Sequence, residues 1–451
     1  MLWRNLVRRI VQALFSLVFV IAYGWSLASE LDRLVVGVST HFAQRRGVPT
    51  VDIRHIQDIG FNSFRDEVYW ASVEVTKGVL SVPQELGQYD EMITLSKDIN
   101  VRPLVILSYG NPHHTPDGMP VDAAGREAFA RYAEFVANRY RTRVLGFEIW
   151  NEWNKGAGGR GPGRRSDVES YWALVSEVAP RLRLIDPSAR IVVGAVAGRD
   201  LDWIRELATS PGFEEMVDGI SIHPYNFCDG SRSRPEDVLN WLGQLEAELI
   251  RTVGRTVPIY VTEVGWPTYA HRCGTEPEVA AAYFARLILA APSVASLEGL
   301  YFYGYRDKGR DPYNREHNFG LISYEGASKP AVQAISEALA VLGEGDFVSL
   351  RKFGDISVAS YRRVDGSVIS AAWSRSGKER TVRISMDCVD TYRSRRFDTS
   401  RSADGMALFD TVSEWHPCSD EITLGGRPVY FSGFFSDVVS VREADEVWRP
   451  H

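Results

Sequence analysis

Short apolar runs alternate with amphipathic patterns along most of the chain. Eight such runs lie at residues 34–38, 61–64, 101–107, 144–150, 191–195, 219–222, 259–264 and 300–303. The segments between them, such as 124–140 and 279–289, repeat apolar residues at helical spacing. A strand followed by a helix, eight times over, predicts an α/β fold whose parallel sheet closes into a (β/α)8 TIM barrel. An open doubly wound sheet is the alternative, but it requires a glycine-rich fingerprint after the first strand, and VGVSTHF is not one.

The pattern changes after a last predicted helix at 331–342. The tetrapeptide GEGD at 343–346 has the composition of a linker, and apolar and polar residues alternate beyond it. Asp365-Gly366 separates two of these alternating runs and predicts a hairpin turn. We therefore expect a barrel domain at 31–342 and a second domain at 343–451, a small antiparallel β-sandwich. No aromatic cluster in the sandwich marks a site, so support of the barrel is favoured over a binding role.

Residues 1–30 carry the pattern of an export segment. Three arginines within the first nine residues precede an almost wholly apolar run at 10–28, and the first acid is Glu30. The tripeptide SLA at 26–28 fits a cleavage site, whereas the length of the run approaches that of a membrane span. A cleaved signal peptide and a retained inner-membrane anchor both stay open. In either case we expect the remainder to be exported to the periplasm.

The composition of the chain limits the classes of molecule that it is expected to bind. The formal net charge is −7, which argues against nucleic acid because its partners usually present a basic surface. Aromatic residues make up 11%, which is compatible with carbohydrate binding. The cysteines divide into Cys228 and Cys273 in one half and Cys388 and Cys418 in the other, so disulfides within each half are the natural pairing. They lack the clustered spacing of a zinc site, and we predict neither a metal nor a cofactor.

The stretch LGFEIWNEWNKGAGG ends a predicted strand with an acid between tryptophans and amides. On its own, Glu152 is as compatible with a helix cap or a structural ion pair as with catalysis. Reactive residues of a barrel lie at the carboxyl ends of its strands, however, and Glu263 ends the seventh strand as Glu152 ends the fourth. Two facing carboxylates are what glycoside hydrolysis requires. Glu148 shares the strand face of Glu152, and we predict a supporting role for it.

Three further residues suit this chemistry. Arg65 would hold Glu263 ionised, Tyr225 would donate a hydrogen bond to it, and His223 ends the sixth strand nearby. Glu152 needs the opposite electrostatic environment, because a proton donor must stay protonated. We expect a dry setting among the neighbouring tryptophans to raise its pKa.

The motifs WNE and TEVGW, each after a strand and in this order, resemble the clan of retaining glycoside hydrolases built on the (β/α)8 barrel. The resemblance implies that Glu152 is the acid/base and Glu263 the nucleophile. It also implies substrate or supporting roles for Asn151, which contacts the sugar 2-hydroxyl in the clan, and for Arg65 and the His223–Tyr225 pair.

Within the clan, SYGNP, IWNEWN and SIHPY look most like family 39. The export segment and the interval between the two glutamates further resemble the PslG-like endoglycosidases associated with bacterial exopolysaccharide operons. The xylosidases and iduronidases of family 39 share the same core.

Other polar and aromatic residues at or beyond the predicted strand ends are candidates for contacting substrate. They are His41, Trp70, Tyr109, Asn111, Trp153, Trp266 and Tyr305. We expect about half of the aromatic ones to line the cleft and the rest to belong to the core.

The function expected from these observations is a retaining, endo-acting hydrolase of a biofilm- or capsule-type exopolysaccharide, working without a cofactor. One alternative is an exo-acting xylosidase- or iduronidase-like glycosidase. Another is a non-catalytic glycan-binding protein on the same scaffold. An open groove would favour endo action, and a wide separation of the carboxylates would favour mere binding.

Overall fold

The computed structural model describes residues 34–161, 164–388, 391–394, 414–417, 419–433 and 435–443. Within these ranges no helix is both long and apolar enough to cross a membrane. The export segment predicted at 1–30, with its apolar run at 10–28, lies outside them.

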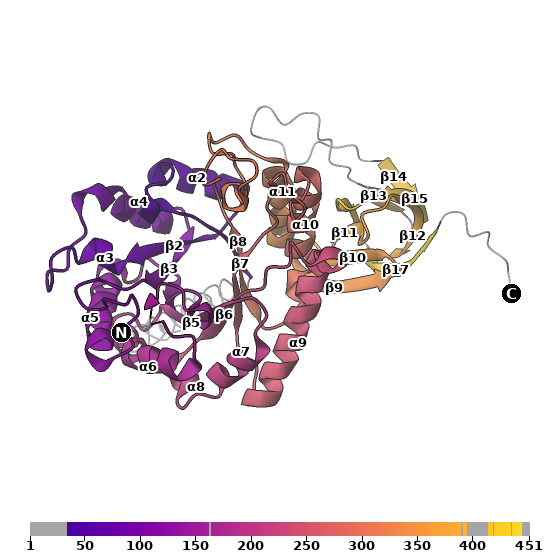
Figure 1. Cartoon of the computed structure of the whole chain (residues 1–451). Helices are drawn as coiled ribbons and strands as arrows, with labels where there is room; N and C mark the ends of the chain where they lie inside the picture. The colour runs from indigo at the N-terminus through magenta and orange to yellow at the C-terminus, as the bar shows by residue number, and fades with distance from the viewer. Residues whose placement is uncertain are drawn as a thin grey trace, which may run out of the picture. The chain divides into compact units, whose positions relative to one another are not determined.

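Eight parallel strands close into a barrel in sequence order, which confirms the predicted fold (Figure 1). The strands are β1 (Val35–Ser39), β2 (Ser63–Tyr69), β3 (Arg102–Ser108), β4 (Gly146–Ile149), β5 (Arg190–Ala197), β6 (Gly219–His223), β7 (Ile259–Val264) and β8 (Leu297–Tyr303). Most of their residues are buried, as expected for parallel strands that helices cover.

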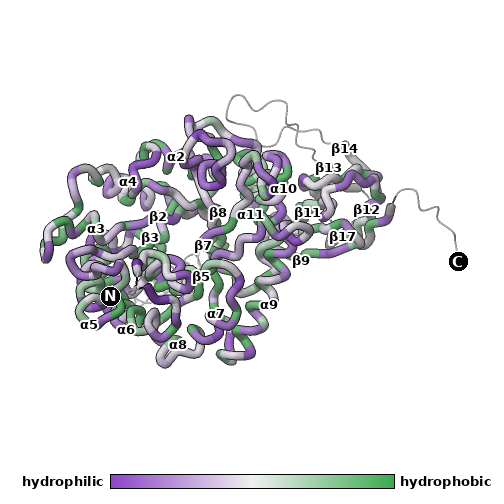
Figure 2. Tube along the Cα trace, in the orientation of Figure 1, coloured by the Kyte–Doolittle hydropathy of each residue, from purple (hydrophilic) through white to green (hydrophobic). Residues whose placement is uncertain are grey.

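Helices connect the strands and continue after the last one. They are α2 (Pro49–Ile59), α3 (Trp70–Val73), α4 (Gly87–Asp98), α5 (Ala123–Tyr140), α6 (Val168–Ile185), α7 (Leu201–Ala208), α8 (Phe213–Met216), α9 (Pro235–Val253), α10 (Pro277–Ala290) and α11 (Pro330–Glu344). Hydrophilic and hydrophobic stretches alternate along them in Figure 2. Helix α5 illustrates the local causes, since the side chain of Asp122 accepts a hydrogen bond from the amide of Gly125 at its start. Its Phe129, Tyr132 and Val136 are fully buried at helical spacing.

Strand β2 differs from its prediction. The apolar pattern indicated a strand at 61–64, whereas the strand runs from Ser63 to Tyr69. Its extra residues include Arg65, Asp66 and Glu67, whose charges obscure a strand that is nevertheless largely buried. Buried charges need partners, and partners from other strands cannot be deduced from the sequence of one strand. The side chains of Arg65 and Glu67 therefore project from strand β2 itself and not from the loop that follows it.

The C-terminal region forms two antiparallel sheets, which confirms the predicted sandwich. A six-stranded sheet has the order β14-β13-β16-β11-β10-β9, and a three-stranded sheet has the order β15-β12-β17. The strands are β9 (Gly345–Phe353), β10 (Ile356–Arg363), β11 (Val368–Ser374), β12 (Arg380–Cys388), β13 (Thr391–Ser394), β14 (Glu414–Pro417), β15 (Ser419–Leu424), β16 (Val429–Gly433) and β17 (Phe435–Glu443). The predicted hairpin at Asp365-Gly366 joins β10 to β11, with Gly366 at φ 84°.

No separate linker precedes the sandwich, because α11 ends at Glu344 and β9 begins at Gly345. Hydrogen bonds instead tie the sandwich to helices α9 and α10. Trp373 Nε1 donates to Glu236 on α9 at 2.9 Å, and Arg286 Nη2 on α10 donates to the backbone oxygen of Arg375 at 3.0 Å. These contacts are of the kind that a supporting role for the sandwich requires, while the domain division at 342/343 stays a prediction.

Candidate active site

A cleft of about 490 Å³ opens at the carboxyl ends of the barrel strands. Its walls come mainly from β1, β2, β7, β8 and the loops that follow β3, β4, β6 and β8. The lining residues are Ser39, Thr40, His41, Gln44, Arg65, Glu67, Tyr69, Ile106, Tyr109, Asn151, Glu152, Tyr225, Phe227, Glu263, Tyr303, Lys308, Arg315, Glu316 and Phe319.

Arg65 links three acceptors at the floor of this cleft. Its Nη1 lies 2.8 Å from Glu263 Oε1, its Nε lies 2.7 Å from Glu148 Oε2, and its Nη2 donates to Asn151 Oδ1 at 2.9 Å. Arg65 is 3% exposed and Glu148 is 0% exposed. Although burial opposes it, the charges of Glu148 and Glu263 raise the pKa of Arg65, so the guanidinium stays charged. Glu148 therefore faces inward and supports Arg65, as its strand position predicted.

The second oxygen of Glu263 is held by a tyrosine. Tyr225 OH donates to Glu263 Oε2 at 2.8 Å, in the geometry that the spacing after β6 suggested. Each oxygen of Glu263 thus accepts one hydrogen bond, from Arg65 and from Tyr225, while the side chain keeps 12% exposure towards the cleft. These two contacts fix the orientation of the carboxylate and stabilise its negative charge.

Glu152 lies in an unusual backbone segment. After β4, Trp150 and Glu152 both adopt positive φ, at 68° and 51°. Non-glycine residues rarely adopt this region, and such conformations gather at functional sites. The turn brings Glu152 Oε1 to 3.0 Å from His223 Nδ1 and leaves the side chain 31% exposed. Asn151, between them in sequence, donates from Nδ2 to Tyr109 OH at 2.9 Å.

The prediction that the surroundings of Glu152 raise its pKa is wrong. Burial does raise the pKa of Glu152, but the hydrogen bond from His223 and the charges of His223 and Arg65 outweigh it, so the net shift is downward. The tryptophans do not supply the predicted dry pocket, because the carboxyl points away from them into a cleft that holds polar groups. In the unliganded site Glu152 therefore favours its ionised form.

The two glutamates and a histidine converge on one point. Glu152, His223 and Glu263 each offer one ligand atom, and these atoms lie within 4.8 Å of one another. Among the described residues this is the one such group that would suit a metal ion. The guanidinium of Arg65 lies 2.8 Å from Glu263, however, and its positive charge opposes a second cation there.

The structure brings most of the predicted polar candidates together. Arg65, Asn151, Tyr225, His41 and Tyr109 line the cleft with the two glutamates. His223 is fully buried behind Glu152, and its Nε2 lies 3.1 Å from Thr262 Oγ1. His41 packs edge-on against Tyr303, with ring centroids 5.5 Å apart. Burial and the nearby charges of Lys308, Arg46 and Arg65 lower the pKa of His41, which keeps that ring neutral.

Three other candidates do not reach the cleft. Trp70 is fully buried and donates from Nε1 to Glu74 at 2.6 Å. Asn111 Nδ2 donates to the backbone oxygen of the same Glu74 at 2.9 Å. Tyr305 is 2% exposed, and its OH lies 2.8 Å from His55 Nδ1. These side chains hold loops in place and do not line the cleft.

The two remaining tryptophan candidates also belong to the core. Trp153 is fully buried against Trp150 and Tyr171, with ring centroids 5.3 and 5.5 Å away. Trp266 is 1% exposed, and its Nε1 donates to Ser233 O at 2.8 Å. Neither ring offers a face to a sugar. Tyr109 is the one member of the predicted aromatic set that lines the cleft.

Several lining residues were not among the candidates. Glu67 and Tyr69 follow Arg65 at alternate positions of β2, so they share its face, and a longer predicted strand would have identified them. Lys308, Glu316 and Phe319 come from the long loop after β8, where no motif marks them. Lys308 Nζ lies 3.6 Å from Glu316 Oε2 and 4.6 Å from the centroid of the Tyr303 ring.

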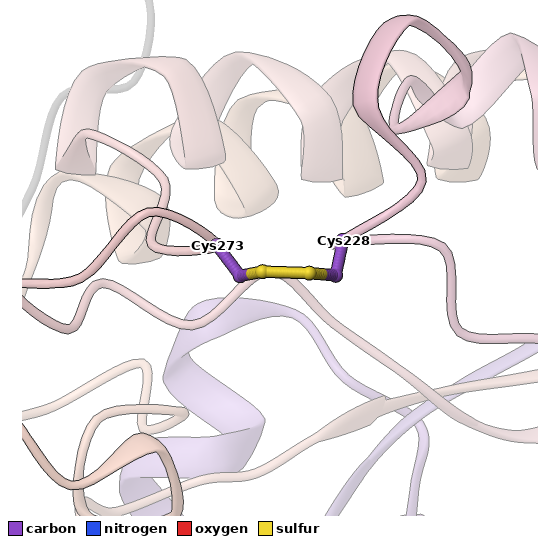
Figure 3. The surroundings of a disulfide bond; sticks show 2 residues. All are labelled: Cys228 and Cys273. Atoms are coloured by element: carbon purple, nitrogen blue, oxygen red, sulfur yellow. A yellow bond between two sulfur atoms is a disulfide. The ribbon is translucent and has the colours of Figure 1, made fainter.

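A disulfide joins the loops after β6 and β7. The bond links Cys228 and Cys273, whose Cα atoms are 4.9 Å apart, across two loop segments (Figure 3). Cys228 directly follows Phe227, which lines the cleft. The bond therefore tethers one wall of the cleft to the loop beyond Glu263. The predicted partners Cys388 and Cys418 lie outside the part of the chain whose side chains the structure describes.

A closed parallel barrel with two facing glutamates after β4 and on β7 defines the class of (β/α)8 glycoside hydrolases. The chain belongs to the cellulase family (glycosyl hydrolase family 5), whose family model matches residues 30–288. The resemblance to the glycoside hydrolase clan is thereby confirmed. A comparison with curated proteins found no match.

Solved structures of other glycosidases share the fold. A family 39 glycoside hydrolase from Bacteroides cellulosilyticus WH2 has a TM-score of 0.70 at 22% identity, covering 89% of this chain and 81% of its own. A monomeric β-xylosidase from Caulobacter crescentus CB15 has a TM-score of 0.62 at 16% identity, covering 91% and 96%. A glucosidase from Croceicoccus marinus has a TM-score of 0.60 at 13% identity, covering 92% and 97%. At these identities the likeness concerns the fold, including the barrel with its appended sandwich.

Proposed function

We propose that the protein is a retaining glycosidase in which Glu263 is the nucleophile and Glu152 the acid/base. In the first step a carboxylate oxygen of Glu263 forms a bond to the anomeric carbon. The bond from that carbon to the leaving oxygen breaks, and Glu152 gives its proton to this oxygen. A glycosyl-enzyme on Glu263 and the free leaving group result.

Water completes the cycle. Glu152, now a carboxylate, takes a proton from a water molecule, whose oxygen attacks the anomeric carbon and displaces Glu263. The downward shift in the pKa of Glu152 suits this base role. The first step needs the same group protonated, so turnover favours acidic pH.

The observation that carries this proposal is the spacing of the acids. The facing oxygen atoms of Glu152 and Glu263 lie within 4.8 Å of each other. Retaining enzymes hold their carboxyl groups about 5–5.5 Å apart, whereas inverting enzymes leave roughly 6.5–9.5 Å for a water molecule. The separation therefore supports direct attack by Glu263.

The surrounding hydrogen bonds support the same assignment of roles. Arg65 and Tyr225 hold the carboxyl of Glu263 in a fixed orientation suited to attack. Asn151 is tied to Arg65 and to Tyr109, which places its amide beside the cleft for a sugar hydroxyl. A binding protein has no need of two acids held in this way.

For the substrate, we propose internal cleavage of a bacterial exopolysaccharide. A volume of about 490 Å³ lies in the range that accommodates ligands larger than one sugar ring. The resemblance of the export segment and of the Glu152–Glu263 interval to PslG-like endoglycosidases supports the polysaccharide class. Exo-acting β-xylosidase activity is the second candidate, because the Caulobacter crescentus β-xylosidase matches almost the whole chain in fold.

We further propose export to the periplasm, with the segment at 10–28 either removed or retained as an inner-membrane anchor. The Cys228–Cys273 disulfide supports an oxidising compartment. Fractionation of cells that express the full chain, with N-terminal sequencing of the product, tests both points. Recovery of an uncleaved chain in the cytosol would contradict the proposal.

The decisive variants are Glu152→Gln and Glu263→Gln, with exposed Glu169→Gln as the matched control. Each is assayed on a panel of aryl glycosides and bacterial exopolysaccharides. We expect the first two to lose activity by about 10³-fold or more and the control to keep it, since only the first two remove a reacting carboxyl. Full activity of either variant overturns the assignment. The sizes of released oligosaccharides separate endo action, which yields a range, from exo action, which yields single sugars.

A further inference from the structure

Glu67 is a third carboxyl on the cleft, and the two-glutamate mechanism does not use it. It lies on β2 two residues beyond Arg65 and two before Tyr69, and all three side chains line the cleft. Across the sheet it pairs in register with Ile106 of β3, another lining residue. Glu67 therefore belongs to the wall formed by β1–β3, on the Arg65 side of the reacting pair.

The surroundings of Glu67 are unfavourable to a charge. One of its oxygens, Oε2, is buried and has no hydrogen-bond partner. Behind it lies a small cavity of about 10 Å³, which Glu67 also lines together with Val73, Leu86 and Tyr89. Burial, followed by repulsion from the charge of Asp66, raises the pKa of Glu67 to about 8.

Asp66, the neighbouring acid, is the member of the pair that carries the charge. Its Oδ2 accepts from Thr40 Oγ1 at 2.6 Å and from the amide of Phe42 at 2.7 Å, and its Oδ1 accepts from the amide of Glu67 at 2.8 Å. Burial raises the pKa of Asp66 as well, but these donors stabilise its carboxylate. Two adjacent buried acids cannot both ionise cheaply, so the proton stays on Glu67.

The other groups that interact electrostatically with Glu67 do not reverse its preference for the protonated form. On its own strand Arg65 favours the ionised form but is already shared by Glu148 and Glu263. The remaining groups are neutral phenols: Tyr69, Tyr89, Tyr109, Tyr132 and Tyr303.

We propose that Glu67 is a specificity-determining residue that presents an uncharged carboxyl to the cleft and binds a hydroxyl group of a neutral sugar. A carboxylic acid can both donate to and accept from a hydroxyl, which a carboxylate cannot. The proposal rests on the proposed glycosidase function and adds the class of sugar at this wall. Turnover already falls with rising pH because Glu152 must be protonated, and the ionisation of Glu67 should make that fall steeper above about pH 8, since the carboxyl then loses the hydrogen bond that it donates.

The experiment compares Glu67→Gln with Glu67→Ala on the aryl glycoside that the wild type turns over fastest, from pH 5 to 9.5. Gln keeps the shape and the hydrogen-bonding groups but cannot ionise. We expect Glu67→Gln to stay within about 3-fold of wild type at pH 6 and to lose the steepening near pH 8, while it keeps the fall that Glu152 causes. Glu67→Ala should raise KM about 10-fold with little change in kcat, as expected when one hydrogen bond to substrate is lost.

A steepening near pH 8 that persists in Glu67→Gln overturns the proposal, and so does a wild-type KM in Glu67→Ala. Melting curves of both variants identify any loss of fold. A wild type without turnover on any glycoside would instead count against the proposed glycosidase function. In that case carboxyl ¹³C NMR of the wild type should still show a glutamate that titrates near pH 8 and is missing from Glu67→Gln, and its absence would overturn the assignment of Glu67.

Discussion

Arg65→Met tests the arrangement on which the whole site depends. Arg65 is 3% exposed and bonds at 2.7 Å to Oε2 of Glu148, which is fully buried and whose Oε1 has no hydrogen-bond partner. The substitution keeps most of the side-chain volume but leaves Glu148 without its cation. Breaking a buried ion pair by removing one partner costs about 3–5 kcal/mol, because an uncompensated charge stays inside. We therefore expect a loss of this size in the free energy of unfolding.

The assay is urea unfolding of Arg65→Met, Glu148→Met and the double variant, followed by tryptophan fluorescence. The double variant should be less destabilised than the sum of the singles, by roughly 1–3 kcal/mol, because it leaves no unpaired charge between these two positions. The double variant should still lack activity, since Glu263 has lost its Arg65 contact. A single-variant loss below about 1 kcal/mol, or strict additivity, would refute this reasoning.

Three further predictions concern residues on and behind the walls of the cleft. Replacing Cys228 and Cys273 by serine should lower the free energy of unfolding by about 4 kcal/mol, since the bond closes a loop of 45 residues; equal melting temperatures would contradict this. His223→Asn removes a hydrogen bond that lowers the pKa of Glu152. That pKa should rise, so the alkaline limb of kcat/KM moves to higher pH, and an unmoved or lowered limb would refute the linkage. Trp153→Ala should cost about 3–5 kcal/mol of stability without a selective rise in KM, as expected for a core ring.

Much of the fold follows from the order of apolar runs. The eight predicted strands correspond to β1–β8 because each run is long enough, and apolar enough, to mark a buried parallel strand. Strand β2 was shortened in the prediction because Arg65 and its acidic neighbours resemble a loop. Their partners, Glu148 on β4 and Thr40 after β1, come together only in the closed barrel. Local patterns cannot show such pairings.

Position at the end of a strand predicted the polar residues of the cleft better than it predicted the aromatic ones. Glu152 and Glu263 face one cleft because carboxyl ends of parallel strands meet at one side of the barrel. A tryptophan that follows a strand is equally suited to the core and to the rim of the cleft. Trp153 and Trp266 both lie in the core. The lowered pKa of Glu152 depends on the 3.0 Å contact with His223, a distance that no spacing in the sequence predicts.

The most direct test of the central claim is to trap the glycosyl-enzyme. The protein is incubated with a 2-deoxy-2-fluoro glycoside that carries a good leaving group, chosen from the sugar turned over fastest, and its peptides are analysed by mass spectrometry. We expect one added fluoroglycosyl group, on the peptide that contains Glu263, and no labelling of Glu263→Gln. Labelling of another carboxyl, or inversion at the anomeric centre seen by NMR of the first product, would contradict it.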